Sequence, residues 1–326
     1  MKLPSLSVVV PNYNHGKYLP RCLAAIAEQS VPPDEIIVVD DASTDNSVEI
    51  LEGLRKKYPI VNVNRNEMNQ GFMGTVNRGV ELATGDFVCM PGADDEVMQG
   101  LFEKSLRLLA EHPEAGISGA ICRIFDVKSG LNYNFGVHVC EKPCYLPPAE
   151  IVRLARLGRF LVFGTTMLWR RDALLKAGKY HPDLKWHCDW FAMFAAAFRH
   201  GMCFVPEVLG EFRVVPSSVS NQGKKKLKVQ LEVLRYALEL LEKEENQDIA
   251  PLFRQSGVLA PFGKEMLWLV LTHRRYWKNA TFVFLRQSLW WIIRIEAKKI
   301  LPNFVASIYY KLTGVSAPTK NNHEPF

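Results

Sequence analysis

The first 125 residues alternate short apolar runs with amphipathic segments. Residues 7–10 and 36–40 are rich in β-branched side chains and end at polar turn residues, which is typical of buried parallel strands. Residues 61–64 and 86–90 indicate two further strands. Between these runs the apolar residues recur at helical spacing, which predicts helices over 18–29, from 43–47 through 58, and over 73–83. This alternation predicts an α/β fold, a mostly parallel central sheet with helices on both faces.

Beyond residue 125 the pattern is less regular. Residues 126–163 are expected to form an irregular connection with one helix over 148–157, because Pro143, Pro147 and Pro148 interrupt them. Regularly spaced leucines predict a helix over 227–245. We therefore divide the chain into an α/β domain, residues 1–222, with halves of about 1–125 and 126–222, and a helical C-terminal region, residues 223–326. The last dozen residues are expected to be a disordered terminus.

The composition is that of a globular protein. Of the 326 residues, 48% are hydrophobic and 23% charged, which excludes a disordered or fibrous chain. No apolar stretch reaches the roughly 18 residues of a membrane-spanning helix. The seven cysteines are odd in number and lack the spacing of a disulfide framework, so free thiols in the reducing cytoplasm are expected.

Positive charge and tryptophans gather near the C-terminus. Residues 249–326 contain eleven Lys or Arg against three acidic residues, a net charge of +8 in a chain whose total is +6, and four of the seven tryptophans. In residues 281–300, four apolar side chains fall within an arc of about 100° on a helical wheel: Leu285, Leu289, Ile292 and Ile293. This pattern predicts a helix on an anionic membrane surface. The alternative is a helix that packs its apolar stripe against the rest of the protein. Nucleic acid is not an expected partner, because no recognised binding module accompanies the charge.

Two acidic pairs follow predicted strands. Asp40 and Asp41 come directly after the second strand, and Asp94 and Asp95 come shortly after the fourth. Since ligands of open α/β sheets bind at the carboxyl ends of the strands, both pairs are expected in one crevice, where a cation would offset their charge. Ligands that are all oxygen indicate Mg²⁺ or Mn²⁺ and not zinc. The alternative is that Asp41 and Asp95 are turn and helix-cap residues.

These segments match a known family in order and context. VVVPNYNHGKYLPRCLAAIAEQS, EIIVVDDASTDNS and NQGFMGTVNRGVELATGDFVCMPGADD resemble the inverting family 2 glycosyltransferases of bacterial surface-polysaccharide type. The resemblance covers about residues 5–220 and implies the Rossmann-like GT-A fold. It implies that Pro11, Tyr13 and Asp41 hold the base and ribose of a nucleotide. It also implies that Asp94 contacts the ribose or sugar, and that Asp95 binds the divalent metal at the donor diphosphate.

The second half continues the resemblance. GTTMLWRRDALLKAGKYHPDLKWHCDWFAMFAAAFRHG is similar to the acceptor half of the family, in which an acidic residue before a helix acts as general base, and that residue corresponds to Asp189. A helix cap before residues 190–198 is the alternative. Cys188 stands where family members often have the Glu of a Glu-Asp pair, and the segment at Arg213 lacks the histidine of the family's Tyr-Arg-x-His. Arg213 is a candidate for contact with the diphosphate, with an ion pair as the alternative.

The resemblance implies transfer of a sugar, with a UDP-sugar as the favoured donor, to a hydroxyl of a glycan or lipid-linked glycan. The enzyme would be cytoplasmic and peripheral on the cytosolic face of the membrane. Two rivals remain at this point. A nucleotidyltransferase also combines an α/β sheet with metal-binding acids, although PNYNHGKY is poor in the glycines and basic residues of its phosphate loop. A catalytically silent carbohydrate- or membrane-binding scaffold would account for the missing motif residues.

Overall fold

The computed structural model describes residues 2–214, 227–313 except 301–309, and 315–320. Within them, eleven strands form one curved sheet: β1 (Leu6–Asn12), β2 (Glu35–Asp40), β3 (Val61–Arg65), β4 (Phe87–Cys89), β5 (Glu96–Val97), β6 (Ile117–Asp126), β7 (Leu131–Phe135), β8 (Cys144–Leu146), β9 (Leu168–Arg170), β10 (Met202–Val214) and β11 (Thr319–Lys320). The main order is β11-β7-β6-β9-β4-β1-β2-β3, and β10 pairs with β5, β6 and β8. The four strands β4, β1, β2 and β3 are parallel to one another, whereas β9 pairs with β4 and β6 in the antiparallel sense.

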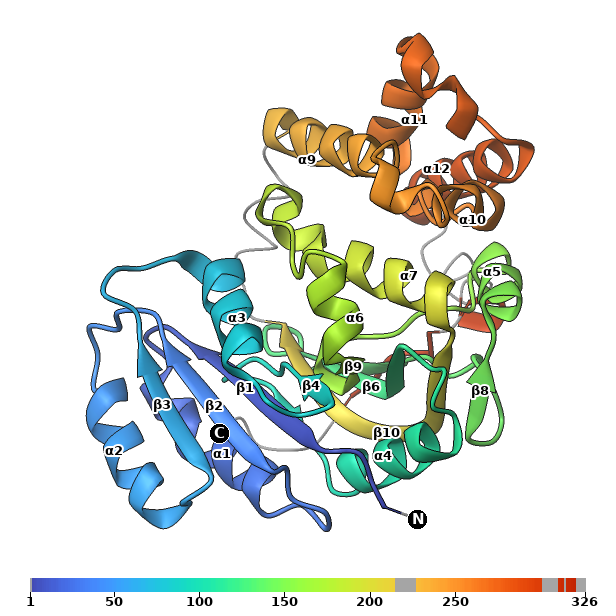
Figure 1. The fold of residues 1–326 in the computed structure, drawn as a ribbon. Helices are drawn as coiled ribbons and strands as arrows, with labels where there is room; N and C mark the ends of the chain where they lie inside the picture. Colours follow the sequence, from blue (N-terminus) through green and yellow to red (C-terminus); the bar gives the residue numbers. More distant parts are fainter. Residues whose placement is uncertain (1, 215–226, 301–309, 314, 321–326) are drawn as a thin grey trace.

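Helices cover both faces of the sheet (Figure 1). The α-helices of the described residues are α1 (Leu19–Ala27), α2 (Ser47–Lys57), α3 (Gly71–Leu82), α4 (Leu101–Glu111), α5 (Pro148–Arg156), α6 (Arg171–Lys176), α7 (Cys188–His200), α9 (Leu227–Leu240), α10 (Ala250–Ser256), α11 (Gly263–Thr272) and α12 (Phe282–Ile300), of which the last four lie away from the sheet. Side chains alternate between the two faces of a strand, so Val8 and Val10 of β1 share a core with α1, α2 and α4. Val9 points the other way, into a core that includes α3 and α7.

The C-terminal helices share that second core with the α/β domain. Figure 1 shows α9 to α12 grouped beyond α7, away from the sheet. Phe253 of α10 is fully buried and stacks on Phe191 of α7 with ring centroids 5.5 Å apart; Phe194 and Phe198 also contact it. Gln287 of α12 donates a hydrogen bond to the carbonyl of Arg156 at 2.9 Å. The helical region therefore supports α7 from the side opposite the sheet.

The predicted fold class is confirmed: a mostly parallel α/β sheet with helices on both faces and a helical C-terminal part. The predicted strands and helices of the first 125 residues are present, with ends displaced by a few residues. In residues 126–163 the predicted helix over 148–157 is present as α5, but the expectation that the rest is irregular is wrong, because β7 pairs with β6 and β8 pairs with β10 there. The domain boundary at residue 222 lies outside the described residues.

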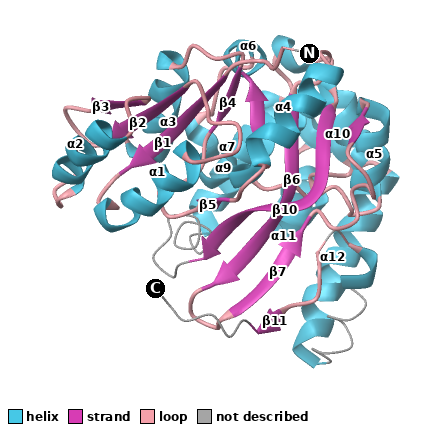
Figure 2. Ribbon diagram, turned by 90° about the horizontal axis from the view of Figure 1, so that it is seen from below, coloured by secondary structure: helices cyan, strands magenta, loops and turns pink. Residues whose placement is uncertain are grey.

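The expected disordered terminus is also partly wrong. Val315 bridges Phe135, and β11 pairs with β7 as an edge strand (Figure 2). Backbone hydrogen bonding to β7 therefore orders residues that carry no strand signal of their own. Residues 321–326 of the predicted terminus lie outside the described residues.

Gly79 sets the close approach of α3 to β1. A Cβ at Gly79 would lie 2.2 Å from Val9 Cγ1, whereas a Cβ at Gly53, in the middle of α2, would meet nothing within 4 Å. We expect Gly79→Ala to destabilise the protein by about 1–3 kcal/mol through overpacking. Gly53→Ala should stabilise it by about 0.5–1 kcal/mol, because alanine restricts the unfolded chain more than glycine does. Urea unfolding midpoints measure both, and shifts in the same direction would contradict the packing argument.

Candidate active site

The loops after β1 and β2 are joined by a polar network. Because β1 pairs in parallel with both β2 and β4, the carboxyl ends of these strands lie at one edge of the sheet. Asn12 Nδ2 donates to Asp40 Oδ1 at 2.8 Å, and the backbone N–H of Ser43 donates to Asp40 Oδ2 at 3.1 Å. Pro11 is buried within β1, and Tyr13, directly after β1, has 46% of its surface exposed. An exposed ring on a fixed loop offers a stacking surface.

Asp41 anchors the start of α3. Its carboxylate accepts hydrogen bonds from Asn66 Nδ2 at 2.6 Å, from the Gln70 N–H at 2.8 Å and from the Gly71 N–H at 2.9 Å. The two backbone donors belong to the N-terminal end of the helix, where a carboxylate is favourable. The structure thus gives Asp41 a capping function at the same strand edge, and its contact with a nucleotide stays a prediction.

Asp95 is a buried carboxylate with one oxygen left over. Thr165 Oγ1 donates to Asp95 Oδ2 at 2.8 Å and the Gly92 N–H does so at 3.2 Å. Asp95 Oδ1 is buried and has no hydrogen-bond partner among the described residues. Burial raises the pKa of Asp95 to about 7, and the neighbouring Asp94 carboxylate adds to the rise. Hydrogen bonds from Thr165 and from the Gly92 and Arg213 N–H groups lower the pKa and offset part of this rise.

This arrangement fits a divalent cation. A buried carboxylate oxygen that lacks a donor, next to a second carboxylate, supplies the hard oxygen ligands that Mg²⁺ and Mn²⁺ prefer. No group of three or more metal-binding side chains occurs among the described residues. Asp95 would therefore hold the ion together with oxygens from a diphosphate and from water, as Mg²⁺ sites commonly do.

One short turn connects Asp95 with Asp189. The turn is the 3₁₀ segment Gly164–Thr166, directly before β9. Thr165 binds Asp95, while a Cβ on the adjacent Gly164 would lie 3.8 Å from Asp189 Oδ2. Asp189 lies in the first turn of α7, one residue inside the helix, so the expected helix start at residue 190 is corrected to Cys188. The structure thus brings both predicted functional carboxylates close to adjacent residues of the same turn.

The sequence analysis gave Thr165 no function. Its hydroxyl matters because the chain folds back to Asp95, 70 residues earlier, and no local pattern records that contact. The only feature of the sequence that could have indicated a function here is the Gly-Thr-Thr run before a strand. Gly210 of β10 is a second residue at this turn to which the sequence analysis gave no function. A Cβ at Gly210 would lie 2.6 Å from Thr166 Cγ2, so only glycine lets β10 pass this close to the turn.

Arg213 is held by carboxylates in this structure. Its Nε donates to Glu211 Oε1 at 3.2 Å, and its Nη2 lies 3.7 Å from Glu96 Oε2. Glu96 also pairs with Arg21. The ion-pair alternative is therefore present, and contact of Arg213 with a diphosphate stays a prediction. Since Asp95 accepts the Arg213 backbone N–H, Arg213 does lie at the predicted metal site.

Two acidic pairs thus follow strands at one edge of an α/β sheet, and a further carboxylate, Asp189, lies near the short turn that binds Asp95. The model of the glycosyl transferase family 2 matches residues 7–176, just over half of the chain. The chain belongs to this family and is a glycosyltransferase.

Curated relatives agree with this assignment. The uncharacterized glycosyltransferase YibD of Escherichia coli is 29% identical over 249 residues, covering 73% of this chain and 70% of YibD. The amylovoran biosynthesis glycosyltransferase AmsB of Erwinia amylovora is 36% identical over 111 residues, 33% of this chain and 37% of AmsB.

Solved structures share the fold. TarS of Staphylococcus aureus, in complex with UDP-GlcNAc, superposes with a TM-score of 0.58 at 18% identity and covers 93% of this chain and 83% of its own. The mannosyltransferase PcManGT of Pyrobaculum calidifontis, in complex with GDP-Man and Mn²⁺, has a TM-score of 0.58 at 17% identity and covers 89% of this chain and 88% of its own.

The raised pKa of Asp95 predicts a pH dependence of stability without metal. Because the folded-state pKa of about 7 exceeds the ordinary value near 3.9, the contribution of Asp95 to the stability of the fold is fully present below about pH 4 and is lost as the pH rises through 7. The gap of about 3 pH units corresponds to roughly 4 kcal/mol at most. In EDTA, Asp95→Asn should therefore melt above wild type at pH 8, and the difference should shrink toward pH 4.

Thermal unfolding in EDTA across this pH range measures the effect. Asp172→Asn, at a position whose side chain is 63% exposed, is the control and should follow wild type at every pH. Adding Mn²⁺ at pH 8 should raise the melting temperature of wild type and leave that of Asp95→Asn unchanged. If the melting temperatures of wild type and Asp95→Asn instead change with pH in the same way, the pKa of Asp95 is not raised in the folded protein.

Proposed function

We propose that the protein transfers a sugar, with inversion, from a nucleotide-diphosphate sugar to a hydroxyl of a glycan or lipid-linked glycan acceptor. The observation that carries the proposal is the Gly164–Thr166 turn: the Thr165 hydroxyl binds Asp95, and Gly164 passes near Asp189, whose Oδ2 a Cβ at Gly164 would approach to 3.8 Å. One carboxylate near the leaving diphosphate and another near the attacking hydroxyl suit displacement at a single carbon, by analogy with inverting glycosidases.

Donor binding would use the edge formed by β1, β2 and β4. Pro11 and Tyr13 would contact the base, Asp41 the ribose, and Asp94 the ribose or sugar, while Arg213 would meet the diphosphate after exchanging a carboxylate partner. A UDP-sugar is the donor that we favour. The UDP-GlcNAc complex of TarS and the GDP-Man complex of PcManGT support a nucleotide-sugar donor of this kind.

Asp95 would hold Mg²⁺ or Mn²⁺, and the ion would neutralise charge on the departing diphosphate. The Mn²⁺ in the PcManGT complex supports this choice of ion. The chain's own contribution is to aim Asp95 through Thr165 Oγ1 and the backbone N–H of Gly92, which partly offset the burial that raises the pKa of its carboxyl. These fixed donors orient one carboxylate oxygen and leave the other for the metal.

Asp189 would act as the general base. An acceptor hydroxyl becomes a competent nucleophile only as its proton is removed, and the Asp189 carboxylate would accept it. Its neighbour Cys188 is buried, and burial raises the pKa of the thiol, so Cys188 stays neutral. Asp189 would thus work without the second carboxylate that many family members have beside it.

The reaction would take place in the cytoplasm, on the cytosolic face of the membrane, during synthesis of a surface polysaccharide. AmsB, whose name assigns it to amylovoran biosynthesis, supports the pathway class. Within the described residues, no helix is long and apolar enough to cross a membrane. An anionic membrane surface is the partner that we expect for residues 281–300.

Asp189→Asn tests the base. The variant should lose about 10²- to 10⁴-fold in transfer rate, the usual contribution of a general base, and should bind nucleotide as wild type does. Asp183→Asn is the matched control, because Asp183 is exposed on the neighbouring 3₁₀ segment. Initial rates and thermal shifts with the donor nucleotide measure the two properties. Unchanged transfer by Asp189→Asn would remove Asp189 as the base.

Thr165→Val tests the support of the metal site. Valine keeps the shape of threonine but removes the donor to Asp95, so the metal concentration for half-maximal rate should rise about 10- to 100-fold. Thr166→Val is the matched control: Thr166 Oγ1 donates to the Ala120 carbonyl at 3.0 Å and does not contact Asp95. It should lower the melting temperature without changing the metal requirement. Equal metal requirements for the two variants would contradict the assignment to Thr165.

A thermal-shift titration with UDP, GDP, CDP and dTDP, with and without Mn²⁺, identifies the donor class. A ligand at about 100 times its dissociation constant adds roughly 2.7 kcal/mol of stability, which is readily measured. A Mn²⁺-dependent shift with UDP that Asp95→Ala abolishes is the expected result. No shift with any nucleotide would favour a catalytically silent scaffold of the same fold.

A further inference from the structure

Helix α12 has two apolar faces, and one of them is exposed. Phe284 and Trp291 pack into the core shared with α7, and Ser288 on the same side is fully buried. On the opposite side Phe282 is 79% and Leu289 57% exposed, and Leu285 and Ile293 are also exposed. These four side chains fall within about 80° on a helical wheel. We call them the outer stripe of α12. Of the predicted arc, Leu285, Leu289 and Ile293 are exposed and Ile292 is half-buried, while α12 packs on the protein through its other face.

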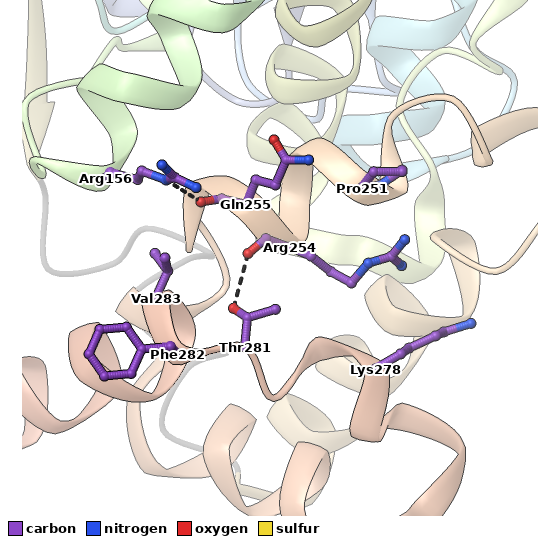
Figure 3. Close-up of a pocket in the computed structure, with 8 residues that line it drawn as sticks. All are labelled: Arg156, Pro251, Arg254, Gln255, Lys278, Thr281, Phe282 and Val283. Carbon is purple, nitrogen blue, oxygen red and sulfur yellow. Dashed lines mark hydrogen bonds between the residues drawn. The ribbon is translucent and has the colours of Figure 1, made fainter.

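A basic pocket adjoins the first residue of the stripe. Phe282 and Val283 line a pocket of about 410 Å³ together with Arg156, Arg254 and Lys278, and none of its lining residues is acidic (Figure 3). Lys278 pairs with Glu242 at 3.0 Å, outside the pocket lining. Among the described residues, no carboxylate lies within ion-pair distance of Arg254. In Figure 3 the side chains of Arg254 and Lys278 extend to the same side. Phe282 and Val283 lie at the other side, so the pocket has the charged ends of Arg254 and Lys278 on one side and an exposed aromatic ring on the other.

Further groups of the same chemistry surround this region. Trp277, in the 3₁₀ segment Arg274–Asn279 that precedes α12, is exposed. Arg286 is exposed within α12, and among the described residues no acidic side chain pairs with it. Residues 249–326 carry eleven basic against three acidic side chains. Exposed aromatic and aliphatic side chains near Arg254 and Arg286 match the two layers of an anionic bilayer surface, phosphate outside and acyl chains beneath.

We propose that the outer stripe of α12 inserts into the interface of an anionic phospholipid bilayer, with a lipid phosphate in the Arg156–Arg254–Lys278 pocket. Phe282 links the two parts, because it lines the pocket and begins the stripe. The proposal gives the membrane localisation proposed above a defined surface and a defined anion site. Vesicle binding requires neither donor nor acceptor. An absence of vesicle binding would therefore not count against the transfer reaction, and an absence of transfer activity would not count against the membrane surface.

Co-sedimentation of the full chain with vesicles tests the proposal. Vesicles of phosphatidylcholine with phosphatidylglycerol should pellet the protein, and vesicles of phosphatidylcholine alone should pellet much less of it. Leu285→Ser with Leu289→Ser should weaken binding to anionic vesicles at least about tenfold at all salt concentrations. Arg254→Gln should weaken binding severalfold at low salt and have less effect at high salt, because screening already removes the attraction there.

Leu82→Ser is the matched control, since Leu82 at the end of α3 is 41% exposed and lies outside the stripe. It should bind vesicles as wild type does. Binding that is equal for wild type and the double serine variant would overturn the proposal, as would absence of binding to anionic vesicles. If the stripe instead joins two copies of the chain, analytical ultracentrifugation will show a dimer that the double variant abolishes, without vesicle binding, and the proposal then fails.

Discussion

The buried carboxylate of Asp95 is the constraint on which the rest of the site depends. Burying an ionised carboxylate is costly unless fixed donors or a cation compensate it. The chain supplies the donors from three segments: Gly92 in the same loop, Thr165 before β9 and the backbone of Arg213 in β10. The Gly92 backbone lies close to both carboxylates of the acidic pair, since a Cβ at Gly92 would be 2.9 Å from Asp94 Oδ1 and 3.2 Å from Asp95 Oδ2. The remaining oxygen of Asp95 has no partner among the described residues, which makes a bound cation the natural completion of this site.

The position of Asp189 depends on how α7 is packed. One side of α7 faces the sheet, and the other is covered by aromatic side chains, Phe253 of α10 and Phe262, which lies 4.7 Å from Trp190 between ring centroids. The C-terminal helices are therefore part of the support for the acceptor side. Trp190 belongs to this aromatic core, and Trp186 donates a hydrogen bond to Gln230 of α9 at 3.0 Å.

The sequence predicted those parts of the molecule whose signal is local. The β-branched runs of β1 and β2 and the acidic pairs after β2 and β4 are readable because burial and turn chemistry act on neighbouring residues. β7 and β8 were not predicted, because Leu131–Phe135 alternates with asparagine and Cys144–Leu146 is only three residues long; both exist through pairing with β6 and β10. For α12, periodicity identified an apolar stripe but could not decide which face would find a partner, since that choice depends on α10 and α11.

A strained turn explains how two adjacent aspartates serve two different purposes. Ala42 follows Asp41 in the left-handed region, with φ of 58°, at a cost of roughly 1–2 kcal/mol for a residue with a Cβ. The hydrogen bonds on either side hold it there: Asp40 binds Asn12 and Ser43, which closes the gap between β1 and β2, while Asp41 binds Gln70 and Gly71 at the start of α3. The turn therefore fixes three elements, β1, β2 and α3, around one point at the carboxyl edge of the sheet. Strain of this kind persists where the surroundings over-determine the backbone, and here it holds rigid the edge at which a donor nucleotide would bind.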